Sequence, residues 1–200
     1  MKFGIIGSGG REHSLCLALK KSSNVNEIFC IPGNAGTDNI AKNINLNLDD
    51  FEKIKDFFIS NEIALAIIGP EKPLVDGIVE YLENHNIKVF GPNKKASQLE
   101  GSKIFTKNLC KKYNIPTAEF GIFEKVEDAN KFLNKCRLPI VIKADGLASG
   151  KGVYICHSKN EATDAIKEIF DGKFGIAEKI LVEEYNNMSN NYWIVYGTNN

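Results

Sequence analysis

The chain has 200 residues, 43% of them hydrophobic, which is enough to build one or two domains with ordinary cores. Its 25 basic and 25 acidic residues cancel, so the composition excludes a general electrostatic attraction to nucleic acid or to an anionic membrane. The five cysteines are odd in number, lie far apart and form no C-x-x-C pair. We therefore expect reduced, mostly buried thiols, and neither a disulfide framework nor a zinc site.

The apolar runs of the chain bear on its location. The first of them, at residues 1–7, is too short for the core of a secretory signal. No apolar stretch approaches the ~20 residues that a membrane span needs. We therefore expect a cytoplasmic protein that binds neither nucleic acid nor a membrane.

A glycine-rich turn follows the first predicted strand. Residues 2–6 form a short apolar strand, and the turn GSGGREH at residues 7–13 leads into a helix. Free N–H groups and the helix dipole at such a helix start favour an anion such as phosphate. The dinucleotide fingerprint G-x-G-x-x-G is incomplete, because Glu12 replaces the third glycine and no acid follows the second strand, which argues against NAD. Arg11, Glu12 and His13 either cap the helix and carry surface charge or belong to a site.

Strands and helices alternate over the next 80 residues. Strands are predicted at 27–31, 65–68 and 87–90, and helices at 49–61 and 75–84. This order predicts a parallel, doubly wound sheet with right-handed crossovers. Ligands of such sheets bind at the carboxyl ends of the strands, which here are the turn-rich segments 7–10, 32–37, 69–73 and 91–92. We expect a small phosphorylated molecule there, with Glu71 either a ligand carboxylate or a solvated loop acid.

The second half of the chain reads as a small α+β unit. A helix starts near residue 100 with Ser102 as a possible N-cap and with Phe105, Leu109 and Tyr113 facing inward. A strand at 118–123, a helix at 126–136, a hairpin, a helix capped by Ser158 and a strand at 179–185 follow. We place the domain boundary near residues 100–116, with domains at 1–100 and 101–200.

The hairpin of this second unit has a glycine-rich tip. An unbroken β-branched run ends at Lys143, a loop with three glycines and Lys151 follows, and a second apolar run begins at Val153. Each glycine costs backbone entropy on folding, so three within seven residues indicate that amides without neighbouring side chains are needed there. Such amides can surround an anion, and Lys143 and Lys151 supply compact positive charge to it. The loop enters a strand and is not a Walker A motif. It is typical of a flap laid over nucleotide phosphates, and the alternative is a flexible loop with solvated lysines.

Taken together, seven motifs resemble one family. They are GSGGREH at 7–13, PGNAGT at 32–37, GPE at 69–71, GP at 91–92, QLEGSKIFTK at 98–107, IPTAE at 115–119 and VIKADGLASGKGV at 141–153. The chain is similar over residues 1 to about 185 to the phosphoribosylamine-glycine ligases, which are ATP-grasp enzymes of purine synthesis. The resemblance implies a Rossmann-like substrate domain followed by the start of an ATP-grasp domain with its flap subdomain.

The resemblance also implies a reaction and a set of site residues. ATP would phosphorylate the carboxylate of glycine, and 5-phosphoribosylamine would attack the glycyl phosphate, giving glycinamide ribonucleotide, ADP and phosphate. Lys103 and Lys143 would be the catalytic residues, because positive charge stabilises a transferring phosphoryl group. The ATP-binding residues would be Lys103, Lys143, Asp145, Gly146, Leu147, Ser149, Gly150, Lys151, Gly152, Glu183, Glu184 and Tyr185. Phosphoribosylamine would contact Gly9, Gly10, Arg11, Asn34, Gly36 and Glu71.

The chain departs from the family pattern at its end. Family members run to roughly twice this length, and their magnesium ligands and the rest of the glycine pocket are expected beyond residue 200, so the resemblance assigns no metal ligand to this chain. We expect the 200 residues alone to be inactive, and the completed form to be a monomer. Met188, Asn190 and Tyr192 stand where the family has a glycine and a Glu-x-Ser. Three explanations of this end stay open: a truncated copy, a disrupted frame and an incomplete gene model. Two alternative functions also stay open, namely a non-catalytic nucleotide- or phosphosugar-binding fragment and another ATP-grasp ligase of the same pathway.

Overall fold

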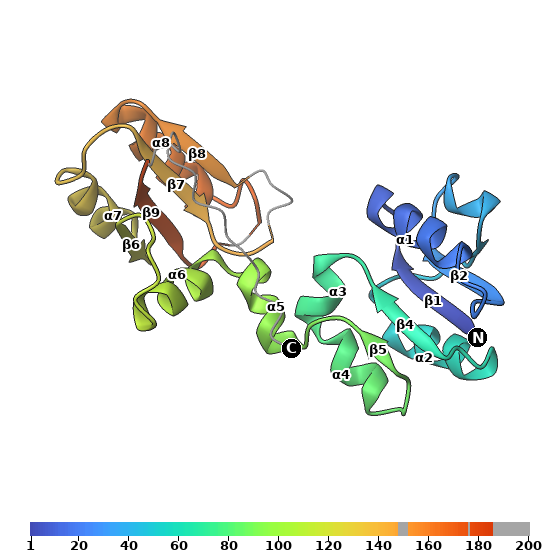
Figure 1. Ribbon diagram of the computed structural model, residues 1–200. Coiled ribbons are helices and arrows are strands. Elements are labelled where there is room, and N and C mark those ends of the chain that lie inside the picture. Colours follow the sequence, from blue (N-terminus) through green and yellow to red (C-terminus); the bar gives the residue numbers. More distant parts are fainter. Residues whose placement is uncertain (148–151, 176, 186–200) are drawn as a thin grey trace. The chain divides into compact units, whose positions relative to one another are not determined.

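The computed structural model describes residues 1–147, 152–175 and 177–185. The chain divides into two compact units, Met1–Gly101 and Ser102–Asn200. Each unit has its own sheet and its own hydrophobic core, and each is described by itself (Figure 1).

The first unit is built on a five-stranded parallel sheet with the order β3-β2-β1-β4-β5. The strands are β1 Lys2–Gly7, β2 Glu27–Pro32, β3 Lys42–Asn43, β4 Leu65–Ile68 and β5 Val89–Phe90. The prediction of a parallel, doubly wound sheet is confirmed. Strand β3 was not predicted, because it has only two residues and depends on pairing with β2.

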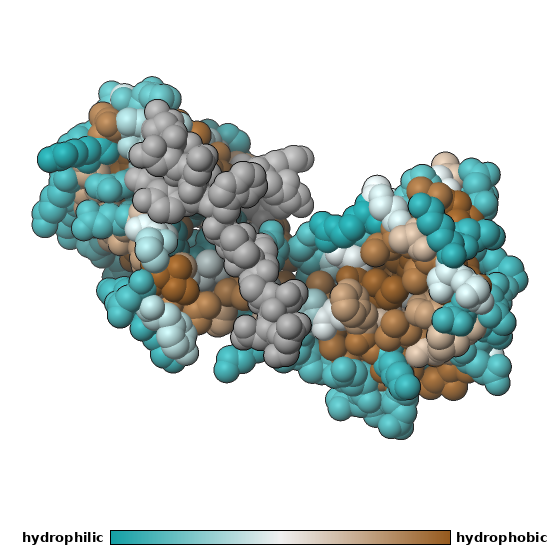
Figure 2. Space-filling model, in the orientation of Figure 1, coloured by the Kyte–Doolittle hydropathy of each residue, from teal (hydrophilic) through white to brown (hydrophobic). Residues whose placement is uncertain are grey.

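Helices cover both faces of this sheet. They are α1 Gly10–Lys20, α2 Phe51–Ser60, α3 Glu71–Asp76, α4 Ile78–Glu83 and α5 Lys94–Gly101, with a short 3-10 turn η1 at Thr37–Asn39. Because side chains alternate along a strand, Ile6 and Ile68 pack with α2 and α4, whereas Ile5 and Ile67 face the cluster that includes Cys16 of α1. In Figure 2 the visible face of this unit (blue to green in Figure 1) has apolar side chains at its middle and hydrophilic ones around them.

Two expectations for the first unit are wrong in detail. The single helix predicted at 75–84 is divided into α3 and α4 by Gly77, which has φ +98° and ends α3 in the left-handed region. The segment 69–73, predicted as a loop, contains the first turn of α3, so Glu71 is a helix-start residue. Pro73 is tolerated there because the first turn of a helix has no intrahelical partner for its N–H groups.

The second unit has a four-stranded antiparallel sheet with the order β6-β9-β7-β8. Its strands are β6 Phe120–Phe123, β7 Ile140–Ala144, β8 Val153–Cys156 and β9 Ile180–Glu184, and its helices are α6 Lys103–Lys112, α7 Val126–Leu133 and α8 Lys159–Phe170. One face of the sheet packs on α7 and α8 through residues such as Ile142, Ile166 and Val182. The predicted hairpin is confirmed as β7 and β8, and the tip at 148–151 lies outside the described residues.

The start of α6 was predicted in part. Ser102 is the N-cap, and its hydroxyl accepts from the Phe105 N–H at 3.0 Å, as expected. The helix begins at Lys103, and the preceding α5 was not predicted. The predicted inward face was wrong for Tyr113, which is 61% exposed, while Phe105 and Leu109 are half-buried and Ile104 is the buried residue of α6. Apolar spacing alone did not show which side of the helix meets the sheet.

Two further findings concern the whole described chain. All five cysteines are free; Cys16, Cys30 and Cys156 are buried, and Cys110 and Cys136 are half-buried. Within the ranges given above, no helix combines the length and the apolar character that crossing a membrane requires.

Candidate functional site

Asn34 ties together two loops at the carboxyl end of the parallel sheet. Its side-chain amide donates to the carbonyl oxygens of Ser8 and Gly9, at 2.8 and 3.2 Å. Its side-chain oxygen accepts from the N–H groups of Gly36 and Thr37, at 2.7 and 3.0 Å. These four bonds use both donors and both acceptor positions of the amide, so Asn34 holds the loop after β1 against the loop after β2.

Glu12 occupies the space that the glycines of this rim leave free. The residue is only 4% exposed, and its carboxylate accepts from the Gly9 N–H at 2.5 Å. A Cβ atom on Gly69 would lie 1.9 Å from Glu12 Oε1, and one on Gly7 would lie 2.6 Å from Glu12 Cδ. Gly10, by contrast, faces open space. Gly7 and Gly69 therefore leave room for a buried carboxylate, whereas Gly10 has open space beside it.

Arg11 links the start of α1 to the start of α3. Its guanidinium forms an ion pair with Glu71 at 2.9 Å and donates to the carbonyl oxygen of Gly69. The backbone N–H of Glu71 and then the Arg11 guanidinium lower the pKa of the Glu71 carboxyl below its ordinary value. Glu71 is therefore neither an isolated loop acid nor buried, since 41% of its side chain is exposed beside Arg11.

In the second unit, one buried carboxylate meets two lysines. Glu183 of β9 has a side chain only 7% exposed and forms ion pairs with Lys143 of β7 and with Lys107 of α6, the latter at 2.6 Å. Val141 pairs with Glu183 and Lys143 pairs with Leu181, so Lys143 and Glu183 lie diagonally on the same face of the sheet. This is the face opposite the core that packs on α7 and α8.

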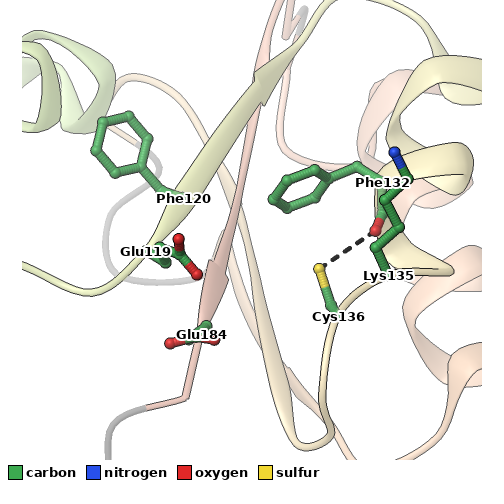
Figure 3. Close-up of a pocket in the computed structure, with 6 residues that line it drawn as sticks. All are labelled: Glu119, Phe120, Phe132, Lys135, Cys136 and Glu184. Carbon is green, nitrogen blue, oxygen red and sulfur yellow. Dashed lines mark hydrogen bonds between the residues drawn. The ribbon is translucent and has the colours of Figure 1, made fainter.

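The two acids at the end of β9 point to opposite faces. Successive side chains of a strand alternate, so Glu184 lies on the side of the sheet away from Lys143. It lines a pocket of about 200 Å³ together with Glu119, Phe132 and Cys136 (Figure 3). Burial, and then the Glu184 carboxylate, raise the pKa of the Cys136 thiol above its ordinary value. Of the two acids expected beside a nucleotide, Glu183 is the one that shares a face with Lys143.

Asp145 joins the end of β7 to the start of α6. Its carboxylate accepts from the Ser102 hydroxyl, at 3.0 and 3.1 Å to the two oxygens, and from the Ile104 N–H at 3.1 Å. The Lys103 ammonium donates to the carbonyl oxygen of Gly146 at 3.0 Å. The residues that begin the glycine-rich loop are thus held to the helix that carries Lys103, and the Asp145 carboxylate acts as a second cap of that helix.

Removal of this second cap has a measurable cost. Asp145→Ala leaves the Ile104 N–H and the Ser102 hydroxyl without their acceptor, so we expect unit 2 to lose about 1–2 kcal/mol of stability. Asp145→Asn keeps one acceptor oxygen and should lose about half as much. Amide hydrogen exchange of α6 measures both; equal protection in Asp145→Ala and the unchanged chain would show that Ser102 alone caps the helix.

The other expected nucleotide-binding residues have mixed positions. Gly152 is buried and its carbonyl oxygen accepts from the Ala144 N–H at 2.8 Å, Leu147 is exposed, and Tyr185 is 38% exposed. Ser149, Gly150 and Lys151 lie outside the described residues. Lys107 was not predicted, although the lysines at 103 and 107 stand one helical turn apart and so share a face of α6.

The described residues contain no group of three or more His, Cys, Asp or Glu side chains arranged to hold a metal ion. Of the acids named above, Glu71 and Glu183 are paired with cations, and Glu12 and Asp145 accept from backbone N–H groups at helix starts. This part of the chain therefore offers hydrogen-bond donors and lysines to a ligand, and no ready cation site.

Comparison with known proteins follows the same division of the chain. Residues 1–100 match the N domain of phosphoribosylglycinamide synthetase, and residues 101–189 match its ATP-grasp (A) domain. The chain is 47% identical over 187 residues to the phosphoribosylamine--glycine ligase of Clostridium acetobutylicum, covering 92% of this chain and 45% of that protein. It thus spans slightly less than half the length of this relative.

Solved structures give the same answer for the fold. The crystal structure of the phosphoribosylamine--glycine ligase of Thermotoga maritima matches with a TM-score of 0.75 and 33% identity, covering 92% of this chain and 44% of that one. The biotin carboxylase domain of Hydrogenobacter thermophilus 2-oxoglutarate carboxylase, solved with MgADP, matches with a TM-score of 0.72 and 23% identity, covering 93% and 44%, which shows the shared fold alone. With both of its units matched in order, the chain belongs to the phosphoribosylglycinamide synthetase family.

Proposed function

We propose that this chain is part of an enzyme that joins glycine to 5-phosphoribosylamine at the expense of ATP, through a glycyl phosphate. The observation that carries the proposal is the arrangement of Lys143 at the end of β7, beside a glycine-rich loop, on the face of the sheet opposite α7 and α8. The name of the Clostridium acetobutylicum relative supports the same reaction.

In this proposal, unit 2 binds the nucleotide. Lys143 and Lys103 offer ammonium groups to the phosphates, and positive charge stabilises the negative charge that spreads over a transferring phosphoryl group. Glu183 lies on the same face as Lys143 and forms an ion pair with it, so its carboxylate holds the lysine at the proposed nucleotide site. Asp145 acts on the loop and on α6, and we assign it a positioning role.

Unit 1 binds phosphoribosylamine in this proposal. Gly10 has open space beside it, and the half-exposed Arg11–Glu71 pair presents both a guanidinium and a carboxylate to solvent. Sugar hydroxyls donate to carboxylates and accept from guanidinium groups, so this pair suits a ribosyl group. Asn34 and Glu12 hold the loops in place, since their polar atoms bond within the rim.

Magnesium accompanies ATP in phosphoryl transfer, where it neutralises charge on the phosphates. The part of the chain that the structure describes lacks a cluster of ligands for it, so we assign no magnesium ligand here. The roles proposed above concern the chain's own side chains only.

A chimaera tests the proposed reaction. Residues 1–185 of this chain would replace the matching part of the Clostridium acetobutylicum relative, which is 47% identical. We expect ADP release that requires both glycine and phosphoribosylamine. Lys143→Ala in the chimaera should weaken ATP binding about tenfold or more, because a hydrogen bond to a charged group contributes about 1.5–3 kcal/mol.

Lys111→Ala is the matched control, because it removes the same charge from an exposed position near the end of α6. A chimaera that folds and binds ATP but releases ADP equally fast without glycine would contradict the proposed reaction. Unchanged ATP affinity in Lys143→Ala would contradict the role of the lysine.

A further inference from the structure

Lys107, which the sequence did not single out for the site, contacts a carboxylate, a hydroxyl and an aromatic ring. Its ammonium lies 2.6 Å from Glu183 Oε2, as an ion pair without the alignment of a hydrogen bond. It also donates to the Thr117 hydroxyl at 2.6 Å and lies 5.4 Å from the ring centroid of Phe120. With 14% of its side chain exposed, Lys107 is held in one place by a carboxylate, a hydroxyl and an aromatic face.

The charges of this cluster do not balance. Two ammonium groups share the single carboxylate of Glu183, so the cluster carries one positive charge more than Glu183 needs. Lys143 is the more exposed of the two lysines, at 26% against 14%, and it stands one residue before the end of β7, where the glycine-rich loop follows. The excess charge is therefore available at Lys143 rather than at Lys107.

We propose that Lys107 is the permanent counter-ion of Glu183, which leaves Lys143 able to exchange Glu183 for a phosphate group of a nucleotide. Removing the only cation from a buried carboxylate is strongly unfavourable. With Lys107 in place, Glu183 stays paired while Lys143 turns to the ligand. Lys107 is thus a positioning residue, and this inference rests on the proposed nucleotide site of unit 2.

The test uses this chain and inorganic pyrophosphate, which has phosphate groups but no base, with binding followed by NMR. Lys107→Met should weaken pyrophosphate binding about tenfold or more although Lys143 is intact, because Lys143 then becomes the sole partner of Glu183. Lys107→Met combined with Glu183→Gln frees Lys143 again and should bring the affinity back to within about threefold of the unchanged chain. Lys107→Arg, which keeps the charge, should also stay within about threefold.

General loss of positive charge is controlled by Lys111→Met, an exposed lysine one helical turn beyond Lys107 on the same helix. We expect less than a threefold effect there, because exposed charges are screened by water and salt (about 10 Å Debye length at 0.1 M). If Lys107→Met and Lys111→Met weaken binding equally, or if the double variant is no better than Lys107→Met, the inference is overturned.

A second measurement needs no ligand. Amide exchange of β9 in Lys143→Met should stay within about threefold of the unchanged chain, because Lys107 still neutralises Glu183, whereas Lys107→Met combined with Lys143→Met should exchange at least about tenfold faster. Exchange in Lys143→Met as fast as in that double variant would overturn the inference. Failure of the unchanged chain to bind ATP or pyrophosphate would count against the proposed nucleotide site and the exchange of partners, while β9 exchange still decides whether Lys107 is the counter-ion.

Discussion

Replacing Glu183 by alanine is expected to destabilise unit 2 by about 3–5 kcal/mol, which is the usual cost of breaking a buried ion pair by removing one partner. The reason is that Lys107 and Lys143, with side chains 14% and 26% exposed, would face each other without an intervening carboxylate. Both lysines would have to leave their positions or remain as unpaired, partly buried charges. Amide hydrogen exchange of β7 and β9 measures the loss within this unit alone.

Glu184→Ala is the matched control, because it removes the same side chain from the next residue, on the opposite face of β9. Its carboxylate lines an open pocket and is only half-buried, so we expect a loss below about 1 kcal/mol. Equal losses of stability from the two substitutions would mean that Lys107 and Lys143 find other partners, and that their pairing with Glu183 does not stabilise unit 2.

The second large effect is expected at Gly69. An alanine Cβ would lie 1.9 Å from Glu12 Oε1 and 2.6 Å from Glu12 Cδ, so the buried carboxylate must move and give up its bond to the Gly9 N–H. Overpacking costs about 1–3 kcal/mol, and loss of a hydrogen bond to a charged group adds about 1.5–3 kcal/mol. We therefore expect Gly69→Ala to destabilise unit 1 by about 2.5–6 kcal/mol, measured by amide hydrogen exchange of β1 and β4.

Two variants make this prediction specific. Gly10→Ala, at a glycine with open space beside it, should change the stability by less than about 1 kcal/mol. In a Glu12→Ala background the clash is absent, so adding Gly69→Ala should cost less than about 1 kcal/mol more. If Gly69→Ala lowers the stability equally with and without Glu12, the Glu12 carboxylate is not the reason that position 69 requires glycine.

Much of the fold was predictable because its signals are local. The buried runs at β4 and β7 and the helical spacing of α7 and α8 appear in the sequence within single windows, and the βαβ alternation of unit 1 dictates a parallel sheet. The two-residue β3 and the division of α3 from α4 were not predictable in the same way. The first depends on a partner strand, and the second on a left-handed conformation of Gly77.

The site was predictable by residue type but less so by role. Lys143 and the glycine-rich loop stand together in the sequence, whereas the partners of the other key groups are distant. Glu183 meets Lys107 across 76 positions, and Asp145 meets Ser102 across 43. Asn34 and Asp145, which the resemblance assigns to ligands, also bond within the site. Motif spacing cannot distinguish a side chain that binds a ligand from one that positions it.

One buried cysteine in each unit allows the local unfolding of that unit to be measured separately. Burial raises the pKa of Cys30 in unit 1 to about 12 and that of Cys156 in unit 2 to about 11, so at neutral pH neither is a reactive thiolate while its unit is folded. An alkylating reagent can modify them only after the surrounding strands separate. Mass spectrometry of the two modified peptides then measures the rate of opening of each unit separately, with no cysteine introduced by mutation.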